Sequence, residues 1–174
     1  DGALTVRSSS QMVNAVKTCL SRLFSLPPAK VRVLSSYIGG GYGGKGGVRG
    51  EPIAALLARK SDRPVGLFYT REEMFTFGGH RVPFVTYIRD GVKKDGTLVA
   101  REMRVTLAIG LYSDYGILIV RRAAAGAVGT YRVPNFKFDS YGVYTNFPLT
   151  GALRGFGCPE VEWPIEQQMD IIAG

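Results

Sequence analysis

The sequence has few of the side chains that most often hold metals or cross-link a fold. Its 174 residues include two cysteines, Cys19 and Cys158, and one histidine, His80. The cysteines lack metal-ligand spacing and are too few for a disulfide framework, which disfavours a zinc site or a stapled secreted domain. His80 lies in a polar loop with no Cys, Asp or Glu at ligand spacing, and we assign it no catalytic role. A reducing cytoplasm is the expected compartment.

Long apolar runs are also missing. No run approaches the length of a transmembrane helix, and the first residues lack the basic and apolar regions of a signal peptide. Hydrophobic residues make up 45% of the chain and charged residues 21%, as in ordinary globular proteins. The length is that of one domain with a sizeable core. Because the chain starts at Asp1 and not at Met, we expect a processed chain or a piece of a longer one.

Acidic residues are fewer than basic ones, 14 against 22, which gives a net charge of +8. That excess permits an acidic partner such as a nucleic acid or a phosphorylated cofactor. The basic residues are scattered, however, and the aromatic residues lack the spacing of an RNA-binding signature. We therefore favour a solvated basic surface over a nucleic-acid-binding module, whose affinity would fall steeply with salt.

Glycine, in contrast, is concentrated in one stretch, residues 38–47, where it fills seven of ten positions. Such a loop leaves peptide N–H groups uncovered, which suits close approach to an oxyanion or a metal-oxo group. The alternating run 31–38 predicts a strand before the loop, and residues 51–60, with Pro52 in the first turn, predict a helix after it. This order of elements places anions near a helix N-terminus.

Two other interpretations of this loop stay open on the residues alone. It can be a glycine-rich surface turn. It can also be a phosphate-binding P-loop, because Gly39, Gly44 and Lys45 fit the first seven positions of that pattern. A P-loop module would bind ATP or GTP with Mg²⁺ and lose that binding on Lys45→Ala. Against it, Gly46 stands where a Ser or Thr should contact Mg²⁺, and no downstream strand ends in an obvious metal-holding Asp.

The rest of the chain predicts a mixture of helices and strands. A strand at 2–7 leads to serines that can cap a helix over 12–24, and the spacing alone favours a capping role for Gln11 at this turn. Apolar residues of this helix, Val16 and Leu20 among them, fall close to a helical period. The clearest element is a β-hairpin with Asp95-Gly96 at its turn. The other expected elements are strands at 64–69 and 136–144 and helices from Thr70, over 115–128 and over 161–173, the last starting late because of Pro164. We therefore predict the α+β class, a mixed β-sheet with packed helices.

A second motif lies between the last expected strand and the last helix, at residues 150–160 (TGALRGFGCPE). Arg154 can hold a carboxylate or phosphate through two parallel N–H bonds. Phe156, between two glycines, offers a ring face to a planar ligand. Taken alone, the motif is a turn with a surface arginine about as often as a site.

The two glycine motifs together resemble the molybdopterin-binding large subunit of the xanthine dehydrogenase/aldehyde oxidase family, the molybdenum hydroxylases. The resemblance covers nearly the whole chain. It extends to residues 4–11 (LTVRSSSQ), 63–65 (RPV), 131–135 (YRVPN) and 166–170 (EQQMD). It implies one domain over 1–174, the N-terminal portion of the molybdopterin-binding region, truncated at both ends relative to the family subunit.

The resemblance also implies a chemistry. Members of the family hydroxylate an electron-poor carbon of an aldehyde or N-heterocycle with oxygen from water. Their cofactor is molybdopterin with molybdenum, and the electrons leave through 2Fe-2S clusters and commonly FAD on other domains or subunits. The implied partners are the remainder of the subunit, these iron–sulfur and FAD components and a small-molecule substrate, with no nucleic acid and no membrane.

The matched motifs imply roles for particular residues, none of which ligates the metal directly. Gln11 would approach the oxo ligand of molybdenum, and Gly41, Tyr42 and Gly43 would lie beside the same centre. The Tyr42 ring, often Phe in the family, would form part of the substrate pocket.

On the second motif, the resemblance implies that Arg154 and Gly155 line the cofactor and that Phe156 stacks on the substrate. Arg122 falls where purine-oxidising members carry a substrate-orienting Arg. Those members also place a Glu directly after the loop lysine, where this chain has Gly46, which weakens purine as the expected substrate.

The general base of the family is a Glu near the C-terminal end of a much longer subunit, outside the region that this chain matches. We expect the chain alone to be catalytically inactive and to bind the cofactor weakly or not at all. Robust substrate oxidation by the isolated 174-residue chain would contradict this expectation.

Overall fold

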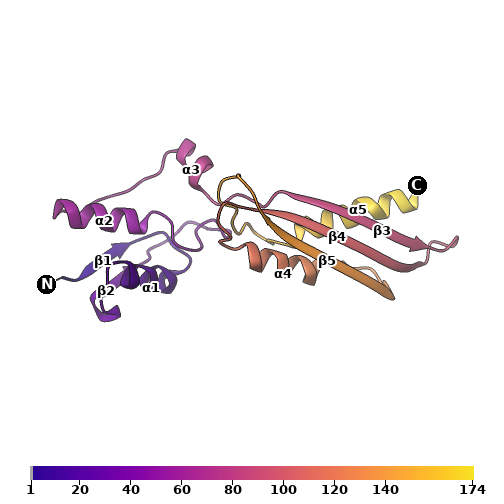
Figure 1. The fold of residues 1–174 in the computed structure, drawn as a ribbon, viewed down its shortest axis with the longest axis horizontal. Coiled ribbons are helices and arrows are strands. Elements are labelled where there is room, and N and C mark those ends of the chain that lie inside the picture. Colours follow the sequence, from indigo (N-terminus) through magenta and orange to yellow (C-terminus); the bar gives the residue numbers. More distant parts are fainter. Residues whose placement is uncertain (1) are drawn as a thin grey trace. The chain divides into compact units, whose positions relative to one another are not determined.

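The structure, a computed structural model, describes residues 2–174 and has the predicted α+β class (Figure 1). By its contacts the chain divides into two compact units, Asp1–Phe75 and Thr76–Gly174. Each unit has its own cluster of buried apolar side chains. We describe each unit by itself.

The first unit is built on a pair of short parallel strands, β1 (Leu4–Arg7) and β2 (Val31–Leu34). Parallel neighbours need a crossover connection, which α1 (Val13–Leu23) and a short 3-10 helix (Pro28–Lys30) provide. Val16 and Leu20 of α1 are fully buried against Val31, together with Ala55 of the next helix, α2 (Glu51–Ser61). The apolar spacing of Val16 and Leu20 had predicted that they share one face of this helix.

Of the two helix caps expected in this unit, the one at Thr70 is present, whereas α1 has Met12 as its N-cap and no side-chain cap. The Ser10 hydroxyl accepts a hydrogen bond of 3.0 Å from the Met12 N–H at the start of α1. At α3 (Arg71–Phe77), the Glu73 carboxylate accepts from Thr70 N at 2.7 Å and Thr70 Oγ1 accepts from Glu73 N at 3.2 Å. This reciprocal pair is the capping box that the sequence predicted.

Two strand predictions in the first unit need correction. The strand expected over 31–38 ends at Leu34, because its partner β1 spans four residues and leaves no ladder for a longer strand. The strand expected over 64–69 is wrong. The segment lies outside the strands of the described chain, and its Phe68 side chain is 91% exposed. Strand-like composition does not make a strand without a neighbour to accept its backbone hydrogen bonds.

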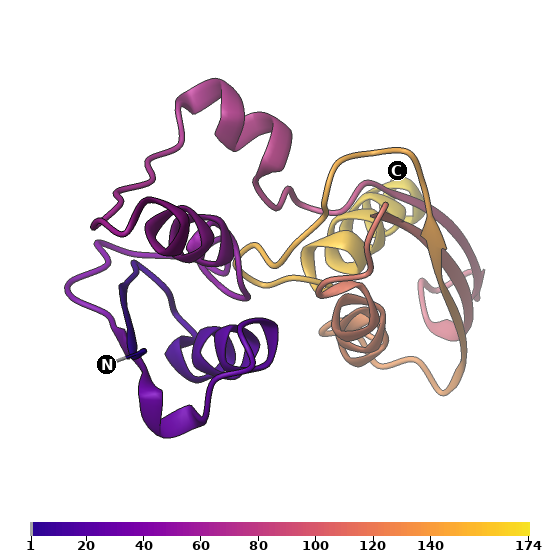
Figure 2. The same cartoon turned by 60° about the vertical axis from the view of Figure 1, so that its left-hand side comes forward.

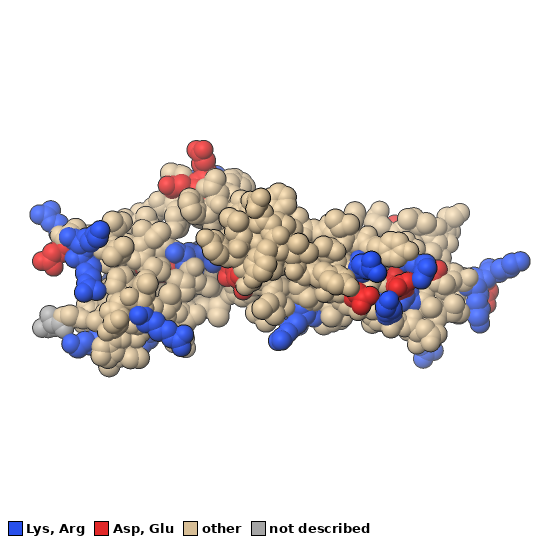
Figure 3. Space-filling view, viewed as in Figure 1, with Lys and Arg blue, Asp and Glu red and all other residues tan. Residues whose placement is uncertain are grey.

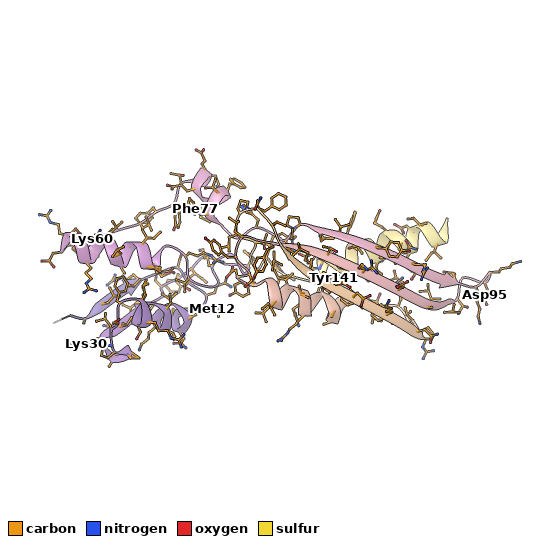
Figure 4. All side chains as sticks on the ribbon, in the orientation of Figure 1. Met12, Lys30, Lys60, Phe77, Asp95 and Tyr141 are labelled. Atoms are coloured by element: carbon orange, nitrogen blue, oxygen red, sulfur yellow. The ribbon has the colours of Figure 1, made fainter. Side chains whose placement is uncertain are left out.

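The second unit contains a three-stranded mixed sheet of order β3-β4-β5. Strands β3 (Phe84–Val92) and β4 (Leu98–Gly110) form the predicted hairpin, with Gly96 at φ +84° and the Asp95 carboxylate accepting from Thr97 N at 3.0 Å. Figure 4 shows Asp95 at the tip of this hairpin. Strand β5 (Asn135–Tyr144) joins β4 in parallel, and the α4 segment supplies the crossover between them.

Two helices cover one face of this sheet, α4 (Gly116–Gly126) and α5 (Pro159–Ala173), as Figure 2 shows. The alternate residues of β4 that point toward them are buried in one core with both helices. This core contains Met103, Val105, Leu107 and Ile109 of β4, Ile119 and Ala123 of α4, and Val161 and Ile165 of α5. The period of two along the strand thus decides which face the helices cover.

The last helix differs from its prediction. It begins at Pro159 and carries Pro164 in its interior, whereas a helix over 161–173 with Pro164 in its first turn was expected. An internal proline lacks the N–H that would bond the carbonyl four residues earlier, that of Glu160. The apolar contacts of Val161 and Ile165, both fully buried, hold the helix through this gap. Tertiary packing therefore overrides the local preference.

Charges are dispersed over the surface of each unit. Figure 3 shows Lys and Arg side chains scattered and not gathered in one block. Among the described residues, no helix is long and apolar enough to cross a membrane. In the same part of the chain, no group of three or more His, Cys, Asp and Glu side chains is arranged to hold a metal ion.

Candidate functional site

The glycine loop of the first unit is a run of tight turns that follows β2. Gly44 N donates to Gly41 O at 2.8 Å and Gly46 N to Gly43 O at 2.9 Å. Four of its glycines have positive φ, namely Gly39, Gly40, Gly43 and Gly47, and so does Tyr42 at +50°. A non-glycine residue with positive φ costs backbone energy and is enriched at functional sites.

Gln11 is joined to this loop by its backbone and its side chain. Its N–H donates to Lys45 O at 2.9 Å, and its Oε1 accepts from Gly43 N at 3.1 Å. Since a backbone N–H can only donate, the atom facing Gly43 is the amide oxygen, and Nε2 points elsewhere with two N–H donors. The residue is exposed, so those donors can reach a ligand. The capping role favoured from spacing is not observed, because α1 has Met12 as its N-cap and no side-chain cap.

Gly41 makes room for this amide. A Cβ placed on Gly41 would lie 2.4 Å from both Cδ and Oε1 of Gln11, far closer than van der Waals contact. The absence of a side chain at Gly41 therefore leaves a space, here called the cradle, that the Gln11 carboxamide fills. Gln11, Gly41 and Gly43 are brought together here, and their place beside a cofactor stays a prediction.

The Tyr42 ring stands out from the loop. The side chain is 63% exposed, and its ring packs on the loop backbone, since a Cβ on Gly40 would lie 3.1 Å from Tyr42 Cε2. An exposed ring fixed by its backbone is suited to contact a planar ligand.

The P-loop alternative finds no support in this geometry. The Lys45 ammonium donates to the carbonyl of Ile38 in its own loop. The start of α2 is occupied by its own carboxylate, because Glu51 accepts from the Ser8 hydroxyl at 2.6 Å and from Arg49 N at 2.7 Å. The negative charge that a helix N-terminus favours is thus supplied by the chain itself.

The second motif forms a compact loop at the start of α5. Phe156 N donates to Leu153 O at 2.8 Å and Cys158 N to Gly155 O at 2.9 Å. The Phe156 ring meets the Tyr115 ring edge to face, with centroids 6.2 Å apart and planes at 61°. Phe156 is therefore held on one side, as a stacking residue must be.

This loop lies directly on α4. A Cβ on Gly157, whose φ is +91°, would lie 2.6 Å from the carbonyl oxygen of Ile119 and 2.7 Å from Arg122 Cβ. Arg122, which is exposed, thus leaves the helix beside the loop of Phe156. The structure brings Arg122 together with this loop, and its role toward a substrate stays a prediction.

Arg154 and Gly155 form the outer turn of the same loop, and both are exposed. The Arg154 carbonyl accepts a hydrogen bond of 2.9 Å from Arg81 Nη2. Its guanidinium makes no hydrogen bond or ion pair within the described residues, so it is available to a ligand. Gly155 has φ +83°, which the turn requires.

Sequence reasoning missed two residues that contact this loop, Arg81 and Glu160. Glu160 is the last residue of the motif at 150–160, and Arg81 follows His80, to which no role was assigned. A carboxylate in the first turn of a helix has an ordinary capping explanation. Nothing in the local sequence signals that the two side chains meet.

Comparison with known proteins identifies the class. The family described as the molybdopterin cofactor-binding domain matches residues 1–174, and the chain belongs to this family. The resemblance inferred from the two glycine motifs is thereby confirmed.

Particular relatives agree with this assignment. The chain is 34% identical over 174 residues to a probable xanthine dehydrogenase subunit of Bacillus subtilis, covering 100% of this chain and 23% of that protein. It is 36% identical over 173 residues to the nicotinate dehydrogenase large molybdopterin subunit of Eubacterium barkeri, covering 99% and 41%. The aldehyde oxidoreductase from Desulfovibrio desulfuricans has a similar structure, with a TM-score of 0.93 at 28% identity, covering 99% of this chain and 19% of that one. The chain thus spans between a fifth and two fifths of these relatives' lengths.

Proposed function

We propose that this chain supplies part of the cofactor site of a molybdenum hydroxylase that oxidises an aldehyde or N-heterocycle with oxygen from water. Family membership and the names of the relatives support the reaction class. The observation that carries the proposal is the Gln11 carboxamide, whose oxygen is held by Gly43 N–H and whose donors have no hydrogen bond within residues 2–174, so that they can meet an oxo group. When bound, the cofactor would supply the hydroxylation chemistry.

The residues of this chain would bind and orient the reactants. In the first unit, Gln11 would donate from Nε2 to the oxo ligand, the uncovered backbone of Gly41 and Gly43 would permit close approach of the cofactor, and Tyr42 would present its ring to the substrate. Hydrogen-bond donors that are already held in place beside an atom with partial negative charge stabilise that charge.

In the second unit, Arg154 and Gly155 would line the cofactor, and Phe156, supported by Tyr115, would stack on the substrate. Arg122 would orient a polar group on that substrate, since a guanidinium binds oxyanions through paired N–H bonds. We propose that both units belong to one cofactor-binding region, because one family description spans them.

The partners follow from the same proposal. The remainder of the subunit would supply the other cofactor contacts and the general base, and iron–sulfur and FAD components would remove the electrons. The chain alone would then be inactive. The names of the relatives differ in substrate, so the proposal stops at the class of aldehydes and N-heterocycles. We propose a cytoplasmic location, in keeping with the two free cysteines.

The test is elemental analysis for molybdenum together with fluorescence of the released pterin. It compares this chain with the natural enzyme that carries it, both from cells that make the cofactor. Metal and pterin in the natural enzyme and neither in the isolated chain would support the proposal in full. Absence of both from the natural enzyme would refute it.

A further inference from the structure

A partly buried ion pair lies next to the second glycine loop. Arg81 Nη1 and Glu160 Oε1 are 3.0 Å apart, and the Glu160 side chain is 1% exposed against 33% for Arg81. Taking a carboxylate out of water is costly, and the attraction to one cation repays that cost only when the remaining oxygen lone pairs are also satisfied. The structure shows how they are satisfied.

The remaining atoms of both side chains bond to the loop. Glu160 Oε2 accepts from Gly157 N at 2.8 Å, and Arg81 Nη2 donates to Arg154 O at 2.9 Å. One ion pair therefore holds the first and last residues of the segment 154–157. Charge-assisted hydrogen bonds of this kind are about twice as strong as neutral ones.

Both side chains start from backbone that is itself fixed. Next to Arg81, His80 N donates to Leu149 O at 3.2 Å and Gly151 N to His80 O at 2.9 Å, which ties this segment to the chain just before the loop. Glu160 is in the first turn of α5, beside the fully buried Val161. The ion pair therefore connects the loop to two segments that are held in place by other contacts.

The segment so held carries the two side chains that we propose to face a ligand, the Arg154 guanidinium and the Phe156 ring, the latter partly buried against the core of the second unit. The hydrogen bonds of Arg81 and Glu160 join the two side chains to each other and to the loop backbone. A buried ion pair is weak support for stability by itself, since apolar residues of the same volume often serve as well. Its hydrogen-bonding geometry is better suited to fixing the place of a loop.

We propose that Arg81 and Glu160 are positioning residues, which fix the 154–157 loop and thereby the placement of Phe156 and Arg154 against substrate and cofactor. This inference rests on the proposed function. A displacement of about 1 Å at a reacting centre can cost about 100-fold in rate, so loosening the pair is expected to lower turnover without removing any group that touches the substrate.

The experiment uses the natural enzyme loaded with cofactor and two variants of the pair. Arg81→Lys keeps the charge but cannot donate to both Glu160 and Arg154 in the fork geometry of arginine. Glu160→Gln keeps the size but offers one acceptor in place of two. Matched controls are Arg104→Lys and Glu162→Gln, which make the same changes at exposed side chains with no hydrogen bond to the loop among the described residues.

The first readout is kcat/KM per bound molybdenum, with benzaldehyde as a planar probe and acetaldehyde as a small one. We expect a loss of about 10- to 100-fold with benzaldehyde, a smaller loss with acetaldehyde, and no change in the controls. With Phe156→Ala already present, Arg81→Lys should no longer change the ratio between the two probes. A lower melting temperature with unchanged kcat/KM per molybdenum would overturn the proposal, because it would show a purely structural pair.

The second readout needs no cofactor. Hydrogen exchange of the Gly157 amide, measured in cofactor-free enzyme, should be faster in both variants and unchanged in both controls. Unchanged exchange in the variants would overturn the proposal even if activity fell. If the unmutated enzyme holds no molybdenum, the proposed function fails. The positioning role then falls with it, and the exchange readout alone still shows whether the pair anchors the loop.

Discussion

The two glycine loops are fixed by different kinds of contact. The loop of the first unit is tied by backbone turns and by one exposed carboxamide, that of Gln11. The loop of the second unit is tied by a partly buried ion pair and lies against the backbone of α4. Glycine therefore has a different structural role in each loop. Gly41 leaves room for a side chain that can move, and Gly157 leaves room for a helix backbone that cannot.

This difference predicts that the second loop tolerates change less well. In Gly157→Ala, the new Cβ would lie 2.6 Å from Ile119 O and 2.7 Å from Ala123 N at a φ of +91°. Strain and overpacking together should cost about 2–6 kcal/mol of folding stability. Thermal unfolding of the natural enzyme would show the loss. Gly96→Ala is the matched control, since it has φ +84° and no atom within 4 Å of the new Cβ, so a loss as large there would contradict the packing argument.

The first loop should lose activity and keep its stability when Gln11 is truncated. Gln11→Ala removes the donors proposed to face the oxo ligand, and loss of one such donor typically costs about 100- to 1,000-fold in kcat. Gln11→Glu should be as poor, because a carboxylate still accepts from Gly43 N but cannot donate. Turnover per bound molybdenum measures the effect, with Gln167→Ala at an exposed position of α5 as control. Full activity of Gln11→Glu would rule out the donor role.

Gly41→Ala tests the same loop more gently. The new Cβ would meet the far end of a flexible side chain, so Gln11 can swing away without displacing backbone. We expect about a tenfold loss of turnover per molybdenum, since the donors are displaced and not deleted. The melting temperature should hardly change, in contrast to Gly157→Ala. A large drop in melting temperature would show that the cradle is as rigid as the second loop.

The smallest expected effect concerns an exposed pair on the sheet, for comparison with the partly buried one. A hydrogen bond from Lys137 at 3.1 Å lowers the pKa of Glu102 below 4.5, and the same bond raises the pKa of Lys137. Glu102 then contributes stability above pH 4.5, and this is lost as the pH falls through its lowered pKa. Because Lys137 Nζ also lies 3.5 Å from Asp139 Oδ2, Lys137→Met should lower the melting temperature slightly at pH 7 and not at all once both Glu102 and Asp139 are protonated. A difference from the unmutated protein that persists in acid would contradict this assignment.

Much of the fold follows from short-range rules that the sequence carries openly. Asp95-Gly96 between alternating runs predicted the hairpin, Thr70 and Glu73 predicted a capped helix start, and the apolar spacing around Val16 and Leu20 predicted the buried face of α1. The two glycine motifs were enough to indicate the family. The local signals each depend on residues a few positions apart, and the family was indicated by the pairing of two such local motifs.

The tertiary structure decided what depends on distant partners. Residues 64–69 have strand-like composition but no strand to pair with, and α5 runs through Pro164 because Val161 and Ile165 are buried in the core. Arg81 and Glu160 stand 79 positions apart, and Arg81 and Arg154 stand 73 apart. No local sequence pattern predicts these contacts, because the energy of an ion pair or of a buried side chain depends on the residues that the fold places beside it.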